Sequence, residues 1–308
     1  MASEQAQAVH QMLSDQRNDA RASTSIPSRA EQRSMAERIG ESTAEVTGVV
    51  FEDVTAGGVP AQWVTPLGAS TSRVLLYFHG GGYCFCSMRS HSRLVGHLAR
   101  AAGCRALNVD YRLAPEHPYP AAVTDGLAVY RWLLEQQVES RHIVAAGDSA
   151  GGGIAVALLA QARDAGIPLP AAAVLMSPWV DLAMTAESLT TRVDVDVRQD
   201  PAGTRWCAGL YLAGQDPCSP LASPLYADLT GLPPVYIQAG DWDTLVDDAH
   251  RLADKARGCG VDVQLDVFPE MLHAHQIWVG NMPEADDAVA RIGTYVRQRL
   301  DLPAGSTS

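Results

Sequence analysis

The sequence predicts an α/β fold with a mostly parallel central sheet that is covered by helices on both faces. The first observation is a set of continuous apolar runs of strand length, such as RVLLYF at 73–78, which are typical of strands buried on both sides. The second is that such runs alternate with helical patterns along most of the chain, as βα units do. The third is the composition, 47% apolar and 19% charged, which permits a large core and excludes global disorder.

The expected elements follow in chain order. Two short amphipathic helices, 4–20 and 29–39, precede the first strand. The expected strands are 49–54, 60–65, 73–78, 105–109, 142–146, 171–176, 235–239 and 261–267. The expected later helices are 121–136, 150–163, 245–257 and 284–300, because their apolar residues recur at helical spacing.

The alternation breaks between residues 179 and 232, where prolines are frequent and no strand pattern is present. We expect this insertion to form a helical cap, to which the N-terminal helices, residues 1–45, contribute. The α/β core then comprises residues 46–178 and 233–302. Residues 303–308 are expected to be a disordered tail.

The charge balance argues against several kinds of partner. The chain has 35 acidic and 23 basic residues and a net charge of −12, so it lacks the basic footprint of a nucleic-acid-binding protein and offers little to an anionic membrane. No apolar run approaches the roughly 18 residues that a membrane span needs. The first residues lack the pattern of a secretory signal, so we expect a cytoplasmic protein. The six cysteines form no Cys-x-x-Cys pair, and we expect structural or pocket-lining thiols rather than a metal site.

The strongest local motif is Gly147-Asp148-Ser149-Ala150-Gly151, which lies between an expected strand and an expected helix. It has the pattern of a nucleophile elbow, in which a sharp turn projects the serine hydroxyl above the sheet. The helix N-terminus behind the serine favours developing negative charge. A phosphate-binding turn fits less well, because no lysine follows the glycines as a P-loop requires.

A second motif, HGGGY at 79–83, directly follows the strand expected at 73–78. Acyl transfer passes through an oxyanion that needs preorganised N–H donors, and successive glycines leave such groups unobstructed. A loop of this type accompanies the elbow in lipases and esterases. We therefore assign the oxyanion donors to Gly81, Gly82 and Ala150, and the two motifs together indicate a serine hydrolase.

An elbow serine needs a general base and an orienting acid, which follow it in that fold in the order acid, then histidine. His273 and His275 follow the last expected strand, and spacing alone does not separate them. His250 lies inside an expected helix, and we expect its side chain to be on the solvated face of that helix. The candidate acids all follow the strand expected at 235–239 and are Asp241, Asp243, Asp247 and Asp248.

These motifs resemble those of the hormone-sensitive-lipase-like esterases, a branch of the α/β-hydrolase fold. The pieces that carry the resemblance are HGGGY at 79–83, YRLAPE at 111–116, GDSAGG at 147–152, and Asp243-Thr244-Leu245 with His273 downstream. The match covers most of the chain after residue 45. Two further stretches, SPWVDL at 177–182 and PLASPLYADLTGLPP at 220–234, resemble bacterial members, some of which are classed as monoterpene ε-lactone hydrolases.

The resemblance implies a triad. The family's acid usually stands in an Asp-Pro-Leu unit, which maps to Asp243-Thr244-Leu245 with threonine in place of proline. The family's histidine maps to His273. Ser149, Asp243 and His273 are therefore the expected nucleophile, acid and base.

The resemblance also implies supporting residues around the oxyanion loop. Arg112 and Glu116 are expected to support the loop through buried contacts, together with His79 and Gly80. Asp148 is expected to bond the elbow backbone rather than take a proton. The peptide bonds before Pro115 and Pro120 are expected to be cis, as is common in the family.

The expected activity is hydrolysis of small, short-to-medium-chain carboxylic esters through an acyl-enzyme, with no metal or organic cofactor. Opening of cyclic esters, such as monoterpene lactones, is the alternative within the same chemistry. A non-catalytic binding protein is a further alternative, because gibberellin receptors share the fold but lack the catalytic histidine. It is remote, because that histidine is present here as His273. Homodimers are common in the family, and the sequence leaves this assembly open.

The substrate pocket is expected to be mainly apolar, with walls from the segment after the glycine loop and from the insertion. Its candidate residues are Tyr83, Cys84, Phe85, Met88, Trp179, Trp206, Leu210 and Tyr211.

Overall fold

An eight-stranded sheet runs through the molecule in the spatial order β1-β2-β4-β3-β5-β6-β7-β8. The computed structural model describes residues 1–22 and 27–304. β2 is antiparallel to both β1 and β4, and all other neighbouring strands are parallel. The strands are β1 (Val49–Ala56), β2 (Val59–Pro66), β3 (Ser70–Phe78), β4 (Cys104–Val109), β5 (Ile143–Asp148), β6 (Ala172–Met176), β7 (Val235–Gly240) and β8 (Val263–Phe268).

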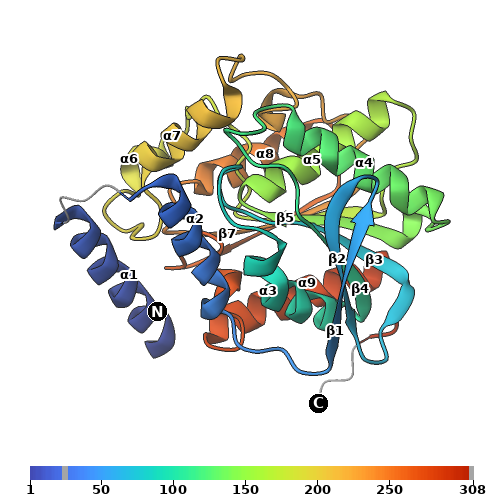
Figure 1. Cartoon of the computed structure of the whole chain (residues 1–308), viewed down its shortest axis with the longest axis horizontal. Coiled ribbons are helices and arrows are strands. Elements are labelled where there is room, and N and C mark those ends of the chain that lie inside the picture. Colours follow the sequence, from blue (N-terminus) through green and yellow to red (C-terminus); the bar gives the residue numbers. More distant parts are fainter. Residues whose placement is uncertain (23–26, 305–308) are drawn as a thin grey trace.

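Helices cover both faces of this sheet, as the sequence predicts. α3 and α9 lie on one face, and α4, α5 and α8 lie on the other (Figure 1). The helices are α1 (Glu4–Ala22), α2 (Arg29–Glu37), α3 (Met88–Ala102), α4 (Ala121–Glu135), α5 (Ala150–Asp164), α6 (Ser188–Thr191), α7 (Pro201–Leu212), α8 (Val246–Gly258) and α9 (Pro283–Arg299). Short 3-10 turns are η1 (Arg38–Ser42), η2 (Ser140–His142), η3 (Pro224–Tyr226) and η4 (His275–Trp278).

The central strand β3 explains why the predicted strands read as continuous apolar runs. Successive strand side chains point to opposite faces. Leu75 and Tyr77 belong to the apolar cluster under α3 and α9, whereas Leu76 and Phe78 belong to the cluster under α4, α5 and α8. All four side chains are fully buried, so both faces of the strand must be apolar.

One helix of the structure is missing from the sequence-based prediction. α3 follows the glycine loop and begins at an N-cap, Ser87, whose hydroxyl accepts a hydrogen bond from the backbone of Arg89. It ends at Gly103, which has the left-handed φ of 67° that glycine adopts without strain. Its buried face includes Ser90 and His91, and these polar residues interrupt the apolar pattern. The other expected helices and strands are present, with ends shifted by a few residues.

The segment between β6 and β7 contains α6, α7 and η3, and no strand within the described part of the chain. In Figure 1, α1 and α2 lie on the same side of the molecule as α6 and α7. Arg17 on α1 reaches the insertion, since its Nη1 donates to the carbonyl oxygens of Val193 and Asp196. The division into a core and a cap stays a prediction, and residues 305–308 of the expected tail lie outside the described residues. None of the described helices combines the length and apolar character that crossing a bilayer requires.

Candidate active site

The expected nucleophile stands at a sharp turn between β5 and α5. Ser149 has φ 53° and ψ −120°, a strained conformation for a residue with a side chain. Its N–H donates to the carbonyl of Met176 (2.9 Å) and its own carbonyl accepts from the N–H of Trp179 (3.0 Å). A side chain at Gly151 would collide with the carbonyl oxygen of Phe78. Glycine at this position therefore lets α5 approach β3 closely enough to form the elbow.

Asp243 and His273 meet at the carboxyl ends of β7 and β8. Asp243 is fully buried, and its Oδ2 lies 2.8 Å from Nδ1 of His273. Its Oδ1 accepts a hydrogen bond from the N–H of Leu245 (2.8 Å). The other ring nitrogen of His273, Nε2, is buried and has no hydrogen-bond partner among residues 1–22 and 27–304. An imidazole held at Nδ1 and unpartnered at Nε2 is arranged to exchange a proton at Nε2.

The remaining candidates from the sequence lie elsewhere. His275 is buried against Phe268, and burial lowers its pKa to about 3, so the ring is neutral. His250 is exposed on α8, as expected. Asp241 forms a partly exposed ion pair with Arg192 (3.1 Å). Proximity to a carboxylate therefore separates His273 from His275, which spacing in the sequence does not.

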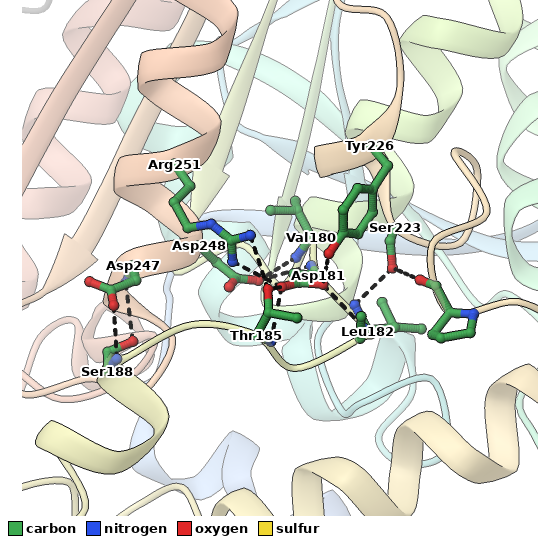
Figure 2. Close-up of polar contacts among 12 residues, drawn as sticks. Val180, Asp181, Leu182, Thr185, Ser188, Ser223, Tyr226, Asp247, Asp248 and Arg251 are labelled. Carbon is green, nitrogen blue, oxygen red and sulfur yellow. Dashed lines mark hydrogen bonds and ion pairs between the residues drawn. The ribbon is translucent and has the colours of Figure 1, made fainter.

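Asp247 and Asp248 each bind backbone groups of the insertion (Figure 2). Oδ2 of Asp248 accepts from the N–H groups of Val180 (2.9 Å) and Asp181 (3.0 Å). Asp247 accepts from the N–H of Ser188 (2.8 Å). Both carboxylates therefore tie α8 to the insertion instead of facing His273.

The glycine loop presents free amides beside Ser149. Gly81 and Gly82 have φ values of 113° and 59°, which favour glycine, and both line the same cavity as Ser149. The N–H groups of Gly81, Gly82 and Ala150 donate no hydrogen bond to any described residue. Ala150 is the first residue of α5, where the helix dipole adds positive potential. This arrangement suits a developing oxyanion.

Asp148 supports the glycine loop. The sequence-based prediction that its side chain bonds the elbow backbone is wrong. Its Oδ1 accepts from the N–H of Gly80 (2.8 Å) and from the hydroxyl of Tyr77 (2.6 Å). Although burial alone would raise the pKa of Asp148, the nearby His91 and the hydrogen bond from Tyr77 hold it below its ordinary value. A carboxylate that accepts several hydrogen bonds stays ionised. Asp148 therefore anchors the loop as an anion.

His79 packs under the same loop. Its ring stacks on Tyr111 with centroids 4.3 Å apart, and Nδ1 lies 2.7 Å from the carbonyl oxygen of Gly80. Burial, together with the neighbouring His91, lowers the pKa of His79 to about 3. The neutral ring thus fills space beneath the glycines.

Arg112 and Glu116 do not make the buried contacts implied by the resemblance. Arg112 is half-exposed and pairs with Asp125 (2.7 Å), which projects from α4. Glu116 is half-exposed and pairs with Arg33 of α2 (2.6 Å). Arg33 is the residue that reaches the loop, since its Nε donates to the carbonyl of Cys84 and its Nη2 to that of Ala114 (both 3.0 Å).

The peptide bonds before Pro115 and Pro120 are cis, as predicted.

A cavity of about 460 Å³ opens beside Ser149 and His273, within the size range of small-ligand sites. Of the predicted pocket residues, Phe85, Trp179 and Trp206 line it. The other five, which pack around the cavity or against the core instead, are Tyr83, Cys84, Met88, Leu210 and Tyr211. Tyr83, for example, stacks on Tyr211 with centroids 3.9 Å apart. Lining residues that the sequence prediction missed include Cys86, His91, Arg198, Cys207 and Leu245.

Comparison with known proteins agrees with this geometry. The sequence profile of the alpha/beta hydrolase fold family matches residues 75–277. An acetyl-hydrolase from Streptomyces hygroscopicus is 47% identical over 244 residues, which are 79% of this chain and 81% of the relative. An esterase from Acinetobacter venetianus is 34% identical over 235 residues, 76% and 77% of the two chains.

A solved structure extends the similarity to almost the whole chain. The crystal structure of an esterase from the bacterial hormone-sensitive lipase family superposes with a TM-score of 0.92 at 43% identity. The match covers 97% of this chain and 99% of the other. The chain is therefore a member of the α/β-hydrolase family, in the branch of the bacterial hormone-sensitive-lipase-like esterases.

Proposed function

We propose that this protein is a serine carboxylesterase that hydrolyses small carboxylic esters through an acyl-enzyme. The observation that carries the proposal is the arrangement of His273, which is held by Asp243 at Nδ1 and leaves Nε2 unpartnered, on the wall of a cavity that Ser149 also lines. The family membership supports ester hydrolysis as the reaction class.

In this mechanism Oγ of Ser149 attacks the acyl carbon while Nε2 of His273 accepts the hydroxyl proton. The carbonyl electron pair moves to the oxygen, which accepts hydrogen bonds from the N–H groups of Gly81, Gly82 and Ala150. Collapse of this intermediate expels the alcohol, which takes the proton from His273. A water then gives its proton to His273, attacks the acyl-enzyme and releases the acid, and Ser149 recovers its proton.

The cavity walls support substrates of limited size. Phe85 and Trp206 stack with centroids 6.1 Å apart, and Trp179 and Leu245 add further apolar surface. A volume of about 460 Å³ accommodates a compact ester with a short to medium acyl chain. The relatives described above carry esterase and acetyl-hydrolase names, so lactone opening has no support from them and enters the experiment as a comparison.

The test is hydrolysis of p-nitrophenyl esters from acetyl to dodecanoyl, with an ε-lactone in parallel. Ser149→Ala is expected to lower kcat by about 10³-fold or more. Ser72→Ala, at an exposed serine on β3, is the control and should leave the rate unchanged. An undiminished rate in Ser149→Ala would remove the nucleophile from this proposal. Faster opening of the lactone than of every linear ester would favour the lactonase.

A further inference from the structure

Arg198 brings a guanidinium to the wall of the cavity that contains Ser149. It lies in the connection between α6 and α7 and lines the cavity. The backbone N–H of Arg198 donates a hydrogen bond to Oδ1 of Asp196 (3.0 Å). Asp196 in turn accepts at Oδ2 from the N–H and the hydroxyl of Thr244 (2.8 and 2.9 Å), the residue after Asp243. Arg198 is therefore fixed to the turn that carries the proposed acid.

Among residues 1–22 and 27–304, the guanidinium has a packing partner but no hydrogen-bond acceptor. Its Cζ lies 4.7 Å from the ring centroid of Trp278, an arrangement that favours a cation over the ring face. Nη1 of Arg198 is buried and unpartnered within the described part of the chain, and the side chain donates no hydrogen bond there. Burial lowers the pKa of Arg198 below its ordinary value, but arginine remains protonated in proteins. A buried charged donor without an acceptor is unfavourable.

The nearest carboxylates do not neutralise this charge by direct pairing. Asp148, Asp196 and Asp243 lie close enough to influence Arg198 electrostatically, but none forms an ion pair with it. Each has partners of its own. Asp148 binds Tyr77 and Gly80, Asp196 binds Thr244, and Asp243 binds His273. These three carboxylates thus leave the donors of Arg198 without an acceptor.

We propose that Arg198 is a specificity-determining residue that binds a carboxylate on the substrate, so that the preferred esters carry a second, anionic carboxyl group. This inference rests on the proposed esterase function. The planar guanidinium matches a carboxylate through two parallel N–H···O bonds. Two acidic residues also line the cavity. Asp148 already accepts hydrogen bonds from Gly80 and Tyr77, and Asp200 is exposed to solvent and caps α7. Neither carboxylate accepts a hydrogen bond from Arg198, so the guanidinium donors stay available to a substrate anion.

Two pairs of substrates with equal carbon chains test the inference and show which side of the ester Arg198 contacts. The acyl-side pair is p-nitrophenyl hydrogen glutarate and p-nitrophenyl pentanoate. The alcohol-side pair is the acetate ester of 4-hydroxybutanoate and butyl acetate. For each pair we define the preference as kcat/KM for the carboxylate ester divided by kcat/KM for the neutral ester. It is measured in the wild type, in Arg198→Met and in Arg205→Met, a control at an exposed arginine of α7 outside the cavity.

In at least one pair, Arg198→Met is expected to lower this preference by about tenfold or more, which corresponds to the loss of a charge-assisted hydrogen bond. Any change in its kcat/KM for the neutral ester should be smaller than the change for the carboxylate ester. Arg205→Met should keep the wild-type preference. Equal losses for charged and neutral esters would overturn the inference and make Arg198 a structural counter-charge, and so would an unchanged preference in both pairs.

A measurement on the wild type covers the case in which Arg198→Met fails to fold. Pentanoate and pentanamide are compared as competitive inhibitors of p-nitrophenyl butyrate hydrolysis at fixed ionic strength. Pentanoate is expected to bind about tenfold more tightly than pentanamide, and equal or weaker binding would overturn the inference.

A lack of Ser149-dependent hydrolysis of neutral esters would instead contradict the proposed function itself. Hydrolysis of neutral esters without an Arg198-dependent preference would contradict only this inference.

Discussion

Oδ2 of Asp243 lies 2.8 Å from Nδ1 of His273, although the two residues are 30 positions apart and follow different strands. The parallel pairing of β7 with β8, which aligns Gly240 with Phe268, brings the carboxyl ends of both strands to one edge of the sheet. The contact is therefore produced by strand register together with the two turns that follow. Since Asp243 is fully buried and His273 nearly so, solvent does not screen their interaction.

Asp243→Asn should lower kcat by about 10³- to 10⁴-fold, because an amide no longer fixes the imidazole tautomer or stabilises the imidazolium. Asp241→Asn is the matched control, since Asp241 also follows β7 but forms a half-exposed ion pair with Arg192. It should change kcat by no more than about threefold. Steady-state kinetics on p-nitrophenyl butyrate measure both variants. A larger loss in the Asp241 variant would reassign the acid.

Gly151→Ala should abolish activity and lower the melting temperature, because its methyl group would collide with the carbonyl oxygen of Phe78 and push α5 away from β3. Gly209→Ala is the control inside α7, where a methyl group would meet nothing within 4 Å. We expect it to stabilise the protein by roughly 0.5–1 kcal/mol, because alanine loses less backbone entropy on folding. Thermal unfolding and esterase assays of both variants test this contrast. Wild-type activity in Gly151→Ala would show that the elbow does not need the close approach.

The parts of the site that sequence predicts well are those encoded in contiguous residues. The elbow around Ser149 and the loop at Gly81 and Gly82 each depend on backbone conformations that only certain neighbouring residues permit. Their positions at strand ends follow from the apolar runs before them. The choice between His273 and His275 needs the fold, because both are buried and only the geometry of β7 and β8 shows which one meets a carboxylate.

Contacts between segments that lie apart in the chain are not encoded in local sequence patterns. Arg33 supports the loop after the glycines from 51 residues away, and no periodicity marks it. Arg112 pairs with Asp125, which the fold brings near on α4, rather than acting with Glu116. Arg198 lies in a segment without regular structure between α6 and α7, where an arginine normally indicates solvent. The partners of these charged residues are decided by what the fold packs around them, and local sequence carries little of that information.

Arg33→Met should lower the free energy of unfolding by about 1–2 kcal/mol, because the carbonyl groups of Cys84 and Ala114 lose a charged donor. We also expect kcat/KM to fall several-fold, since Cys84 closely follows the oxyanion donors. Glu116→Gln should have little effect on either quantity, because its ion pair with Arg33 is half-exposed. Chemical denaturation and kinetics on the two variants separate the contributions. Equal effects would mean that the ion pair, and not the backbone contact, supports the loop.

Asp248 gives the fold a pH dependence that can be isolated by substitution. Burial, together with the nearby charge of Asp181, raises its pKa to about 8, even though the N–H groups of Val180 and Asp181 and the charge of Arg251 oppose that rise (Figure 2). In the unfolded chain an aspartate has a pKa of about 4, so between pH 4 and 8 the folded state binds the additional proton. The free energy of unfolding therefore falls as the pH rises through this range.

Asp248→Asn removes the titration but keeps a side-chain oxygen that can accept from Val180 and Asp181. The stability of the variant relative to the wild type should increase from pH 5 to pH 8 by roughly 3–4 kcal/mol. Asp247→Asn is the matched control on the same helix turn, where the carboxylate accepts from the N–H of Ser188. Because this variant keeps Asp248, it should keep the fall in stability between pH 5 and pH 8. Urea unfolding at a series of pH values measures all three proteins. Parallel profiles for Asp248→Asn and the wild type would show that Asp248 does not take up a proton on folding. In that case Arg251 and the two amides would be strong enough to keep the buried carboxylate ionised.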